Sequence, residues 1–462
     1  MLQFRDGPVR LLSLRNSPLL APKTSPSIGM RGKTAISRPF FLSPWFVAWV
    51  LGCILFASGY GNPAQDQARG LPFIRSYPLD EIGNVPRGLR LGFDEFGRLA
   101  VMYDGIYAVL NDSAWLDRIG TSASKEMRMT TIAVSNGQHY YGGRSSWGKV
   151  EITPEGHLKP HPLVPQNAPE WTRVTPFNNV LPTSKGVYFY ELNGAVYWDF
   201  ARQENSFYPM PRLATLFMVG ERVFVSSDDC LLREILPEQG TSRIAAATGL
   251  EGQVVSFAAP LDPSHTLLVL RTGQLMSFDG NTAVPWTPDG PPIDGRITAI
   301  ARLAGGGVAI AIADKGLRLW APDGSLLWAL DLPELGNTRS IASGEPGVLW
   351  AAGGNAVHRI FYDSPQTSFG TALGINAIWP AVGRWDGTTV VCSGSSLFKI
   401  DAAPAGHVSP IRTIADRGLL TTPTIATSGS HLLGGNATGV FSIGSNGQTT
   451  PIISIESVGA LS

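Results

Sequence analysis

The chain has 462 residues, and its 36 basic and 36 acidic side chains give a formal net charge of zero at pH 7. Hydrophobic residues make up 44% of the sequence and charged residues 16%, which excludes a disordered chain because disorder requires low hydrophobicity and high net charge. The 52 glycines and 35 prolines follow no collagen-like period, and they favour many short strands separated by turns.

The first 38 residues form a basic leader, which we expect to be disordered. They carry seven lysine or arginine residues and one aspartate, so this segment has a charge of +6 and the rest of the chain a charge of −6. Nucleic-acid interfaces require a basic stripe. The slightly acidic remainder does not favour one, and we therefore expect no nucleic-acid partner.

Residues 39–61 contain an uncharged apolar run from Phe40 to Tyr60. Basic residues precede the run and small residues end it, which is the order of a secretory signal peptide. The run is also long enough to span a bilayer, so an uncleaved membrane anchor is the alternative. In both cases we expect the residues that follow to be exported, either into the periplasm or held at the inner membrane facing the periplasm. Contact with the membrane would be confined to this segment.

Residues 62–87 are interpreted as a linker with a lead-in strand, and from about residue 88 one pattern recurs. Each copy contains an alternating apolar strand, a glycine-containing turn, a second apolar strand, a polar loop and a third strand. The copies start at or near Leu91, Ile132, Val180, Phe217, Val255, Ile300, Ile341, Ile378 and Ile425, about 42 residues apart on average. Repeats of roughly 40–50 residues with three or four strands are typical of β-propeller blades.

We therefore predict an all-β fold: a β-propeller with a seven-bladed ring over residues 88–370 and two further blades of an incomplete second ring over residues 371–462. Packing sheets face to face around an axis buries surfaces that a single sheet leaves exposed. The alternative is that two weak copies are loops, which leaves one ring of seven or eight blades. A helical solenoid is disfavoured because the apolar residues alternate with period two and Gly or Pro interrupts the chain frequently.

Two residue types have expected places in this repeat. We predict that Gly97, Gly307 and Gly347 form tight turns between the first two strands of their blades, where a positive φ favours glycine. Tryptophans are expected to fill the spaces between blades; they are Trp115, Trp198, Trp286, Trp320, Trp328 and Trp350.

The sequence DEFGRLAV at residues 94–101, followed by Asp-Gly-Ile-Tyr at residues 104–107, resembles the two-component-regulator propeller repeat. Residues 347–353 and 431–441 match the same repeat, and residues 71–85 are similar to the opening of large bacterial hybrid sensor kinases. The resemblance covers about residues 70–445 and implies an extracytoplasmic input module that senses a ligand or contacts another protein in signal transduction. Members of that family continue into a second propeller, a β-sandwich, a membrane span and an output domain, so we expect this chain to be the input half of such a sensor.

The sequence contains no GxSxG, HExxH, P-loop or EF-hand motif, so we predict no catalytic residues. The seven histidines are scattered, and Cys230 and Cys392 lie 162 residues apart, which favours two buried free thiols and predicts neither a metal site nor a cofactor. A non-catalytic ligand-binding module is therefore expected. The alternative is a propeller enzyme that acts on carbohydrate, a lyase or a glycoside hydrolase, which requires converging carboxylates or His–Arg pairs on one face.

The predicted binding site is a rim formed by the loops between the second and third strands of successive blades. The repeat register assigns to this rim Tyr103, Asp104, Arg144, Trp147, Glu191, Asp228, Asp229, Arg271, Asp314, Lys315 and Asn355. This mixture of carboxylates, cations and aromatic rings suits a small polar ligand, such as a saccharide or a peptide, stacked on Tyr103 or Trp147. A membrane sensor protein is the other expected partner. The alternative is that all these residues are ordinary solvated turn residues.

Overall fold

The computed structural model describes most of the chain from residue 68 to residue 454. The described ranges are 68–80, 89–103, 106–117, 129–135, 137–153, 158–375, 380–393, 396–416, 424–428, 431–436, 439–444 and 448–454. The basic leader and the segment 39–61 lie outside them, so both interpretations of that segment stay predictions. Within these ranges the chain forms 37 β-strands and four short 3-10 helices. None of the described helices is long and apolar enough to cross a membrane. The predicted all-β fold is confirmed.

The described strands form nine antiparallel sheets, numbered 1 to 9 in chain order of their first strands. Sheet 1 contains β2 (Arg90–Phe93), β3 (Leu99–Tyr103), β4 (Ile106–Asn111) and β5 (Ala114–Asp117); sheet 2 contains β6 (Met129–Ser135), β7 (Gln138–Gly143), β8 (Ser146–Ile152) and β9 (Leu158–Pro162); sheet 3 contains β10 (Asn179–Pro182), β11 (Gly186–Glu191), β12 (Gly194–Asp199) and β13 (Glu204–Pro209). Sheet 4 contains β14 (Leu213–Val219), β15 (Arg222–Ser227), β16 (Leu232–Leu236) and β17 (Thr241–Ile244); sheet 5 contains β18 (Val255–Pro260), β19 (Thr266–Leu270), β20 (Leu275–Phe278) and β21 (Ala283–Pro285); sheet 6 contains β22 (Ile297–Arg302), β23 (Val308–Ile312), β24 (Gly316–Trp320) and β25 (Leu326–Leu330).

The remaining sheets follow the same order of strands, with one exception in sheet 7. Sheet 7 contains β26 (Thr338–Ala342), β27 (Val348–Gly353), β28 (Ala356–Phe361), β1 (Leu71–Pro78) and β29 (Thr367–Ser368); sheet 8 contains β30 (Ala381–Trp385), β31 (Thr388–Ser393), β32 (Ser396–Ile400) and β33 (Ile411–Asp416); sheet 9 contains β34 (Thr424–Ser428), β35 (His431–Asn436), β36 (Gly439–Ile443) and β37 (Thr449–Ser454). The 3-10 helices are η2 (Glu170–Arg173), η3 (Pro237–Gln239), η4 (Pro333–Leu335) and η5 (Thr371–Leu373).

The repeat register read from the sequence matches these strands. Eight of the nine predicted repeat starts lie in the first strand of a sheet, and Ile378 lies outside the described residues. The turn glycines Gly97, Gly307 and Gly347 have φ values of 75°, 83° and 77°, in the left-handed region that favours glycine. Their predicted place between the first two strands of a sheet is confirmed.

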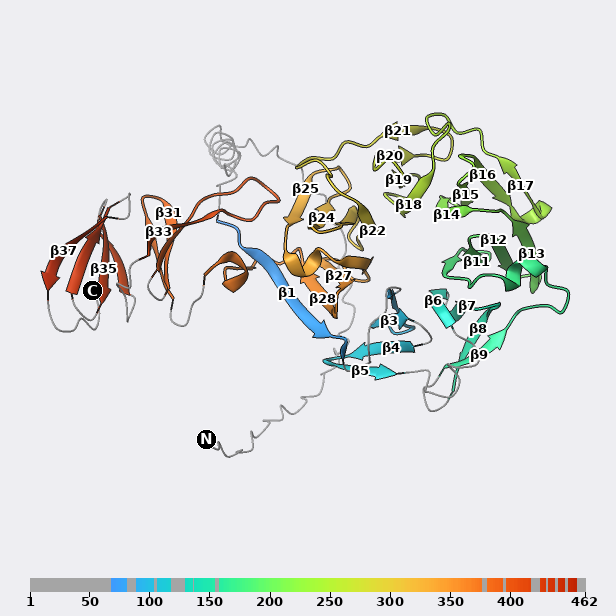
Figure 1. Ribbon diagram of the computed structural model, residues 1–462, viewed down its shortest axis with the longest axis horizontal. Helices are drawn as coiled ribbons and strands as arrows, with labels where there is room; N and C mark the ends of the chain where they lie inside the picture. Colours follow the sequence, from blue (N-terminus) through green and yellow to red (C-terminus); the bar gives the residue numbers. More distant parts are fainter. Residues whose placement is uncertain are drawn as a thin grey trace, which may run out of the picture. The chain divides into compact units, whose positions relative to one another are not determined.

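Sheets 1 to 7 pack against one another in a closed cycle (Figure 1), because seven buried clusters each combine residues of two neighbouring sheets. The last of them joins sheet 7 to sheet 1. One residue from each of the two sheets represents each cluster: Val109 and Tyr141, Trp147 and Phe189, Tyr188 and Val225, Phe224 and Phe278, Val269 and Ile310, Leu319 and Leu349, and Trp350 and Val101. All six tryptophans predicted to fill the spaces between blades belong to these clusters or pack against them.

The lead-in strand expected within residues 62–87 is β1, and it is a structural part of sheet 7. It pairs antiparallel with β28, with Phe73 opposite Phe361 and Tyr77 opposite Val357. Leu79 follows β1, is fully buried, and donates its backbone N–H to the carbonyl of Asn355 at 2.9 Å. Sheet 7 therefore combines strands from the two ends of the ring, and noncovalent pairing holds the ends together.

Sheets 8 and 9 lie in the segment predicted to hold two further blade-like repeats. They share a buried cluster that includes Cys392, Leu397 and Leu432. The thiol of Cys392 is buried, but Cys230 is only half-buried because it lies in a turn of sheet 4. The prediction of a buried thiol is thus confirmed for Cys392 and wrong for Cys230.

Candidate functional site

The predicted rim residues lie at the turns to which the sequence register assigned them. Tyr103 and Glu191 end the second strands of their sheets, and Trp147 is the second residue of β8, the third strand of sheet 2. The other described rim residues lie in the turns between second and third strands: Arg144, Asp228, Asp229, Arg271, Asp314, Lys315 and Asn355. Asp104 and the side chain of Tyr103 lie outside the described residues. Backbone N–H groups of Asp228 and Arg271 donate to the carbonyls of Arg212 and Val254, at 3.0 and 2.8 Å. The turns are thereby tied to the segments that enter the first strands of sheets 4 and 5.

Four charged residues of this rim, Asp228, Asp229, Arg271 and Lys315, form ion pairs within the protein. Arg271 of sheet 5 forms an ion pair with Asp228 of sheet 4. Asp229 lies 2.6 Å from the guanidinium of Arg233, and the Lys315 ammonium lies 2.6 Å from Asp294. The structure thus accounts for these charges locally, without a ligand.

Glu191 and Trp147 are buried, in contrast to the exposed rim expected for them. Glu191 accepts a hydrogen bond from the Thr175 hydroxyl, and burial raises the pKa of its carboxyl. Trp147 has 0% exposure, and its ring centroid lies 5.0 Å from that of Phe177. Its indole N–H donates to Asn205 Oδ1 at 3.0 Å. The prediction that a ligand stacks on Trp147 is therefore wrong, because the pleat of β8 directs this side chain between sheets 2 and 3.

A cavity of about 470 Å³ lies between sheets 7 and 1, and we call it the seam pocket. Its lining comprises Arg75, Tyr77, Phe93, Gly97, Arg98, Leu99, Leu110, Asp112, Ser113, Gly344, Glu345, Trp350 and Arg359. The turns that contribute to it connect first to second strands and third to fourth strands, so it opens on the side of the ring opposite to the predicted rim. Its volume is within the range of about 300–1,000 Å³ typical of small-molecule sites.

Two arginines face each other in the wall of the seam pocket. Arg75 of β1 is directly opposite Arg359 of β28, and Arg359 is directly opposite Trp350 of β27. The Arg359 guanidinium lies 5.1 Å from the Trp350 ring and pairs with Glu345. Arg75 lies 5.0 Å from the ring of Tyr77, and no acidic partner of Arg75 is seen among the described residues. Like charges directly opposite each other in a sheet are destabilising; Glu345 compensates the charge of Arg359, so Arg75 is the guanidinium of this pair that is left for an anion from outside.

A third guanidinium comes from sheet 1. Arg98 Nε lies 2.8 Å from Asp94 Oδ2, and the Asp94 side chain is fully buried. Asp94 Oδ1 also accepts the backbone N–H groups of Phe96 and Arg98, at 3.0 and 2.8 Å. This turn therefore fixes the position of the Arg98 guanidinium, because two backbone N–H groups hold its partner carboxylate. The motif was recognised in the sequence as part of the repeat, but its pocket partners come from strands far away in the chain.

A glycine of sheet 7 shapes the same pocket. A Cβ at Gly344 would lie 2.7 Å from the ring of Phe93, a distance that real Cβ atoms do not show. Glycine at this position lets the first strand of sheet 1 approach the turn of sheet 7 closely. The seam pocket is therefore built by close packing of two sheets and not by a chance gap between loops.

The seam pocket combines three guanidinium groups, two carboxylates and three aromatic rings. Guanidinium groups bind carboxylates and sulfates through paired hydrogen bonds and stack on aromatic faces, so the pocket can hold an anionic ligand that carries a ring.

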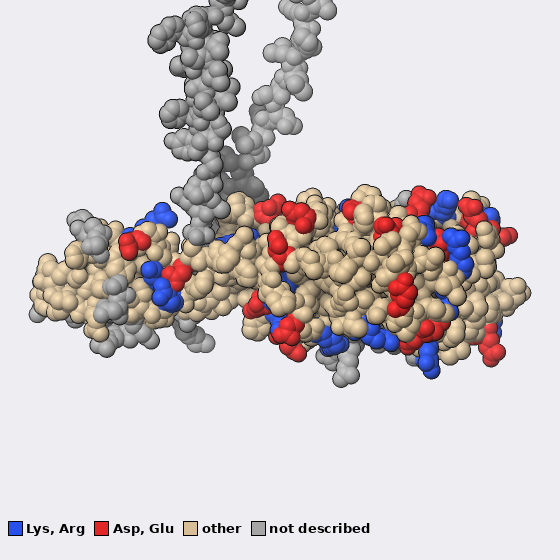
Figure 2. Space-filling view, turned by 90° about the horizontal axis from the view of Figure 1, so that it is seen from above, with Lys and Arg blue, Asp and Glu red and all other residues tan. Residues whose placement is uncertain are grey.

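Among the described residues no group of three His, Cys, Asp or Glu side chains could hold a metal ion. The acid–base pair His139 and Glu95, 3.2 Å apart, has side-chain exposures of 1% and 11%. On the face shown in Figure 2, charged side chains of both signs are interspersed with uncharged ones.

The cyclic packing of the sheets and this pocket define a β-propeller with a ligand-sized cavity where its first and last sheets meet. No family model matches the sequence, and no curated protein matches it. The chain is similar to the WD40 beta propeller domain of Doa1, with a TM-score of 0.47 and 15% identity over 64% of this chain and 97% of that one.

Two bacterial structures are also similar. The extracellular domain of BT4673 from B. thetaiotaomicron, described as a hybrid two component system, has a TM-score of 0.47 and 10% identity, over 82% of this chain and 53% of that one. PorZ, described as a surface component of the type-IX secretion system of Porphyromonas gingivalis, has a TM-score of 0.44 and 11% identity, over 78% of this chain and 50% of that one. The chain therefore spans about half the length of these two structures.

Proposed function

We propose that this chain is a ligand-sensing propeller module of a bacterial signal-transduction system, acting outside the cytoplasm, and that it binds its ligand in the seam pocket without converting it. The observation that carries the proposal is the row formed by Trp350, Arg359 and Arg75 across one face of sheet 7. Two opposed guanidinium groups lower stability. Glu345 already compensates the charge of Arg359, and a ligand anion beside Arg75 would offset the remaining repulsion.

The ligand that this wall favours is a small polar molecule, such as a saccharide or a peptide, with an anionic group. The anion would lie between Arg75 and Arg359, and the rings of Tyr77 and Trp350 would contact its apolar surface. The unpaired state of Arg75 within the described part of the chain supports this assignment. Asp112 and Glu345 at the same pocket would accept hydrogen bonds from ligand hydroxyl or ammonium groups.

Export and sensing rest on the sequence. The apolar run from Phe40 to Tyr60 supports passage across the inner membrane. The repeat between residues 94 and 107 resembles that of extracytoplasmic input modules of hybrid sensor kinases. Because input modules report occupancy and do not transform their ligands, we infer that the chain has no catalytic activity.

A thermal-shift screen tests the proposal. The panel contains a galacturonate disaccharide, acidic peptides and the neutral counterpart of each, and the proteins are wild type, Arg75→Ala and Arg271→Ala. Anionic compounds should raise the melting temperature of wild type and of the rim variant Arg271→Ala, and should not raise that of Arg75→Ala. Equal shifts in all three proteins would place the site elsewhere. Mass spectrometry of each compound after incubation should show no conversion, and a cleaved product would support the carbohydrate-active enzyme instead.

A further inference from the structure

A second cavity, of about 340 Å³, lies at the end of sheet 7 where β1 pairs with both β28 and β29, and we call it the phenylalanine pocket. Its lining comprises Phe73, Phe361, Ser364, Gln366, Thr367 and Ser368. The connection from β28 to β29 crosses β1, because β1 lies between these two strands in the sheet, and this connection supplies the polar part of the lining. The volume is ample for one ring, since a cavity of about 150 Å³ is enough to hold benzene.

The two rings of the phenylalanine pocket can be reached from solvent. Phe73 is 55% exposed, and Phe361 is half-buried. The two residues are directly opposite each other on β1 and β28, and their ring centroids are 5.6 Å apart with the planes tilted by 51°. Because the planes are tilted, the rings form the walls of a cleft and not one flat platform. An apolar group that enters this cleft removes the exposed face of Phe73 from water, which favours binding.

The phenylalanine pocket continues the arginine wall of the seam pocket. Phe73 precedes Arg75 by two residues, and Phe361 follows Arg359 by two residues, so the alternation of side chains along a strand places all four on one face of sheet 7. The Arg359 guanidinium lies 4.7 Å from the ring of Phe361 and 5.1 Å from the ring of Trp350, as this placement requires. Two residues of a strand span about 6.8 Å, and this spacing separates the apolar cleft from Arg75.

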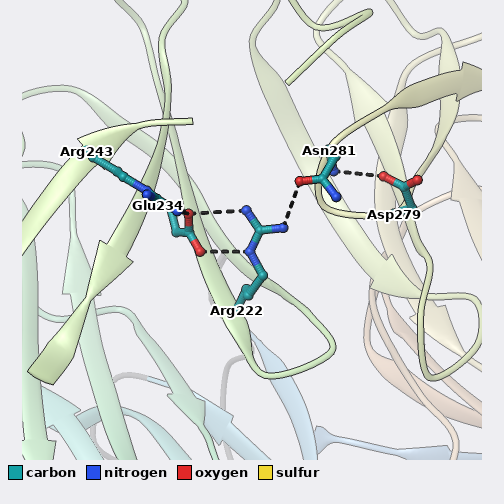
Figure 3. Close-up of polar contacts among 5 residues, drawn as sticks. All are labelled: Arg222, Glu234, Arg243, Asp279 and Asn281. Atoms are coloured by element: carbon teal, nitrogen blue, oxygen red, sulfur yellow. Dashed lines mark hydrogen bonds and ion pairs between the residues drawn. The ribbon is translucent and has the colours of Figure 1, made fainter. Parts of the chain in front are cut away.

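A comparison with sheet 4 shows what Arg75 lacks. In sheet 4, Arg222 and Arg243 lie on either side of Glu234 (Figure 3). Arg222 donates to both oxygens of Glu234, at 2.7 and 3.2 Å, and Arg243 donates to Glu234 Oε2 at 2.8 and 3.1 Å. In sheet 7, no acidic partner of Arg75 is seen in the part of the chain that the structure describes. A ligand can therefore supply to Arg75 the carboxylate that the chain itself supplies in sheet 4.

We propose that the phenylalanine pocket is a subsite for the apolar end of a ligand whose anionic group lies at Arg75, an inference that rests on the function proposed for the seam pocket. The ligand class is a carboxylate joined by a short chain to an apolar group of the size of a phenyl ring, such as an acidic peptide with an aromatic side chain. The apolar group lies between the rings of Phe73 and Phe361. The exposed side chains of Gln366 and Ser368 line the same pocket and hydrogen-bond to polar atoms of the joining chain. A saccharide is disfavoured because its hydroxyl groups would be buried against the two rings.

The test measures the affinity that a ring adds to an anion. The probes are 4-phenylbutyrate, butyrate and the uncharged 4-phenyl-1-butanol, titrated by saturation-transfer NMR against wild type, Phe73→Ala, Arg75→Ala and the control Phe96→Ala. Phe96 is also exposed, at 73%, but it lines neither pocket. Wild type and Phe96→Ala should bind 4-phenylbutyrate at least about tenfold more tightly than butyrate. In this probe the chain of methylene groups spans about the distance between the two subsites.

The two site variants should act on different parts of the probe. In Phe73→Ala the advantage of 4-phenylbutyrate over butyrate should fall by about two- to tenfold, as expected for one aromatic contact, while butyrate binds with unchanged affinity. In Arg75→Ala both acids should bind more weakly by the same factor, and the affinity of the alcohol should stay the same. Because the readout in Phe73→Ala is a ratio of two affinities, a general weakening of both acids cancels.

The possible failures are distinguishable from one another. An advantage that is unchanged in Phe73→Ala, or one that falls equally in Phe96→Ala, overturns the subsite and leaves the seam pocket in place. An alcohol that binds wild type as tightly as 4-phenylbutyrate separates the cleft from the anion site and also overturns the inference. A galacturonate disaccharide that loses affinity in Phe73→Ala by the same factor as 4-phenylbutyrate would assign the subsite to a sugar and contradict the ligand class. Acids that bind Arg75→Ala as tightly as wild type would contradict the function proposed for the seam pocket itself.

Discussion

The turn glycines of three sheets should differ in how much an added methyl group costs. Gly97, Gly307 and Gly347 all have positive φ values, between 75° and 83°, and a non-glycine residue in the left-handed region costs about 1–2 kcal/mol. Their surroundings differ. A Cβ at Gly97 meets no atom within 4 Å, one at Gly347 lies 3.0 Å from Asp363 Cβ, and one at Gly307 lies 2.1 Å from the carbonyl oxygen of Trp320.

These distances give an order for the three alanine variants. Gly97→Ala should lose only the conformational term of about 1–2 kcal/mol. Gly307→Ala must also move the backbone of β24, and overpacking of this kind adds about 1–3 kcal/mol. Gly347→Ala should fall between them, because its 3.0 Å contact with Asp363 Cβ is tight but much less close than the 2.1 Å contact at Gly307.

Thermal melts followed by circular dichroism measure the series. At about 2–4 °C per kcal/mol for domains of 150–250 residues, Gly97→Ala should lower the melting temperature by a few degrees and Gly307→Ala by clearly more. A melting temperature of Gly97→Ala as low as that of Gly307→Ala would refute the turn geometry. Three unchanged melting temperatures would refute the strand register itself.

Three further predictions follow from burial and from the leader. Trp147→Ala should destabilise the protein by about 3–5 kcal/mol in urea unfolding, as loss of a buried tryptophan does, and a loss below about 1 kcal/mol would contradict its place between sheets 2 and 3. Burial lowers the pKa of His358 from 6.5, so the unfolded state binds the proton more readily and stability should fall as the pH decreases below about 6.5. The free energy of unfolding in urea, measured at pH 7.5 and 5.5, should change less between the two pH values for His358→Gln than for wild type. An equal change in both proteins would exclude His358 as the cause. Intact-mass measurement of exported protein should find a terminus near residues 60–65 if the signal is cleaved, whereas a mass that retains Phe40 would leave the membrane anchor.

Local features of the sequence were sufficient to predict the fold class and the strand register. Alternation with period two and the turn-forming residues between the strands are properties of neighbouring residues, so the turns that hold Arg144, Asp228 and Asn355 were placed correctly. The pairing of β1 with β28 joins segments almost 300 residues apart, and no local pattern encodes it. The seam pocket depends on that pairing, because Arg75 and Arg359 become neighbours only when the ring closes.

The direction of single side chains was the weaker part of the prediction. Trp147 lies one residue inside β8, where the pleat directs it into the space between sheets 2 and 3. The turn assignment treated it as a loop residue and therefore as exposed. Glu191 shows the same effect at the end of β11, since a strand residue next to a turn can still face the interior.

Calorimetric titration of the seam pocket tests most directly whether this propeller binds a ligand there. The titrant is the anionic compound that gives the largest thermal shift, and the proteins are wild type and Arg75→Glu. In Arg75→Glu the cross-strand pair with Arg359 becomes attractive, so the free protein should be more stable by about 0.2–1 kcal/mol, while the anion should bind at least tenfold more weakly. A variant that is less stable than wild type and binds the anion with unchanged affinity would contradict the assignment of the seam pocket as the binding site.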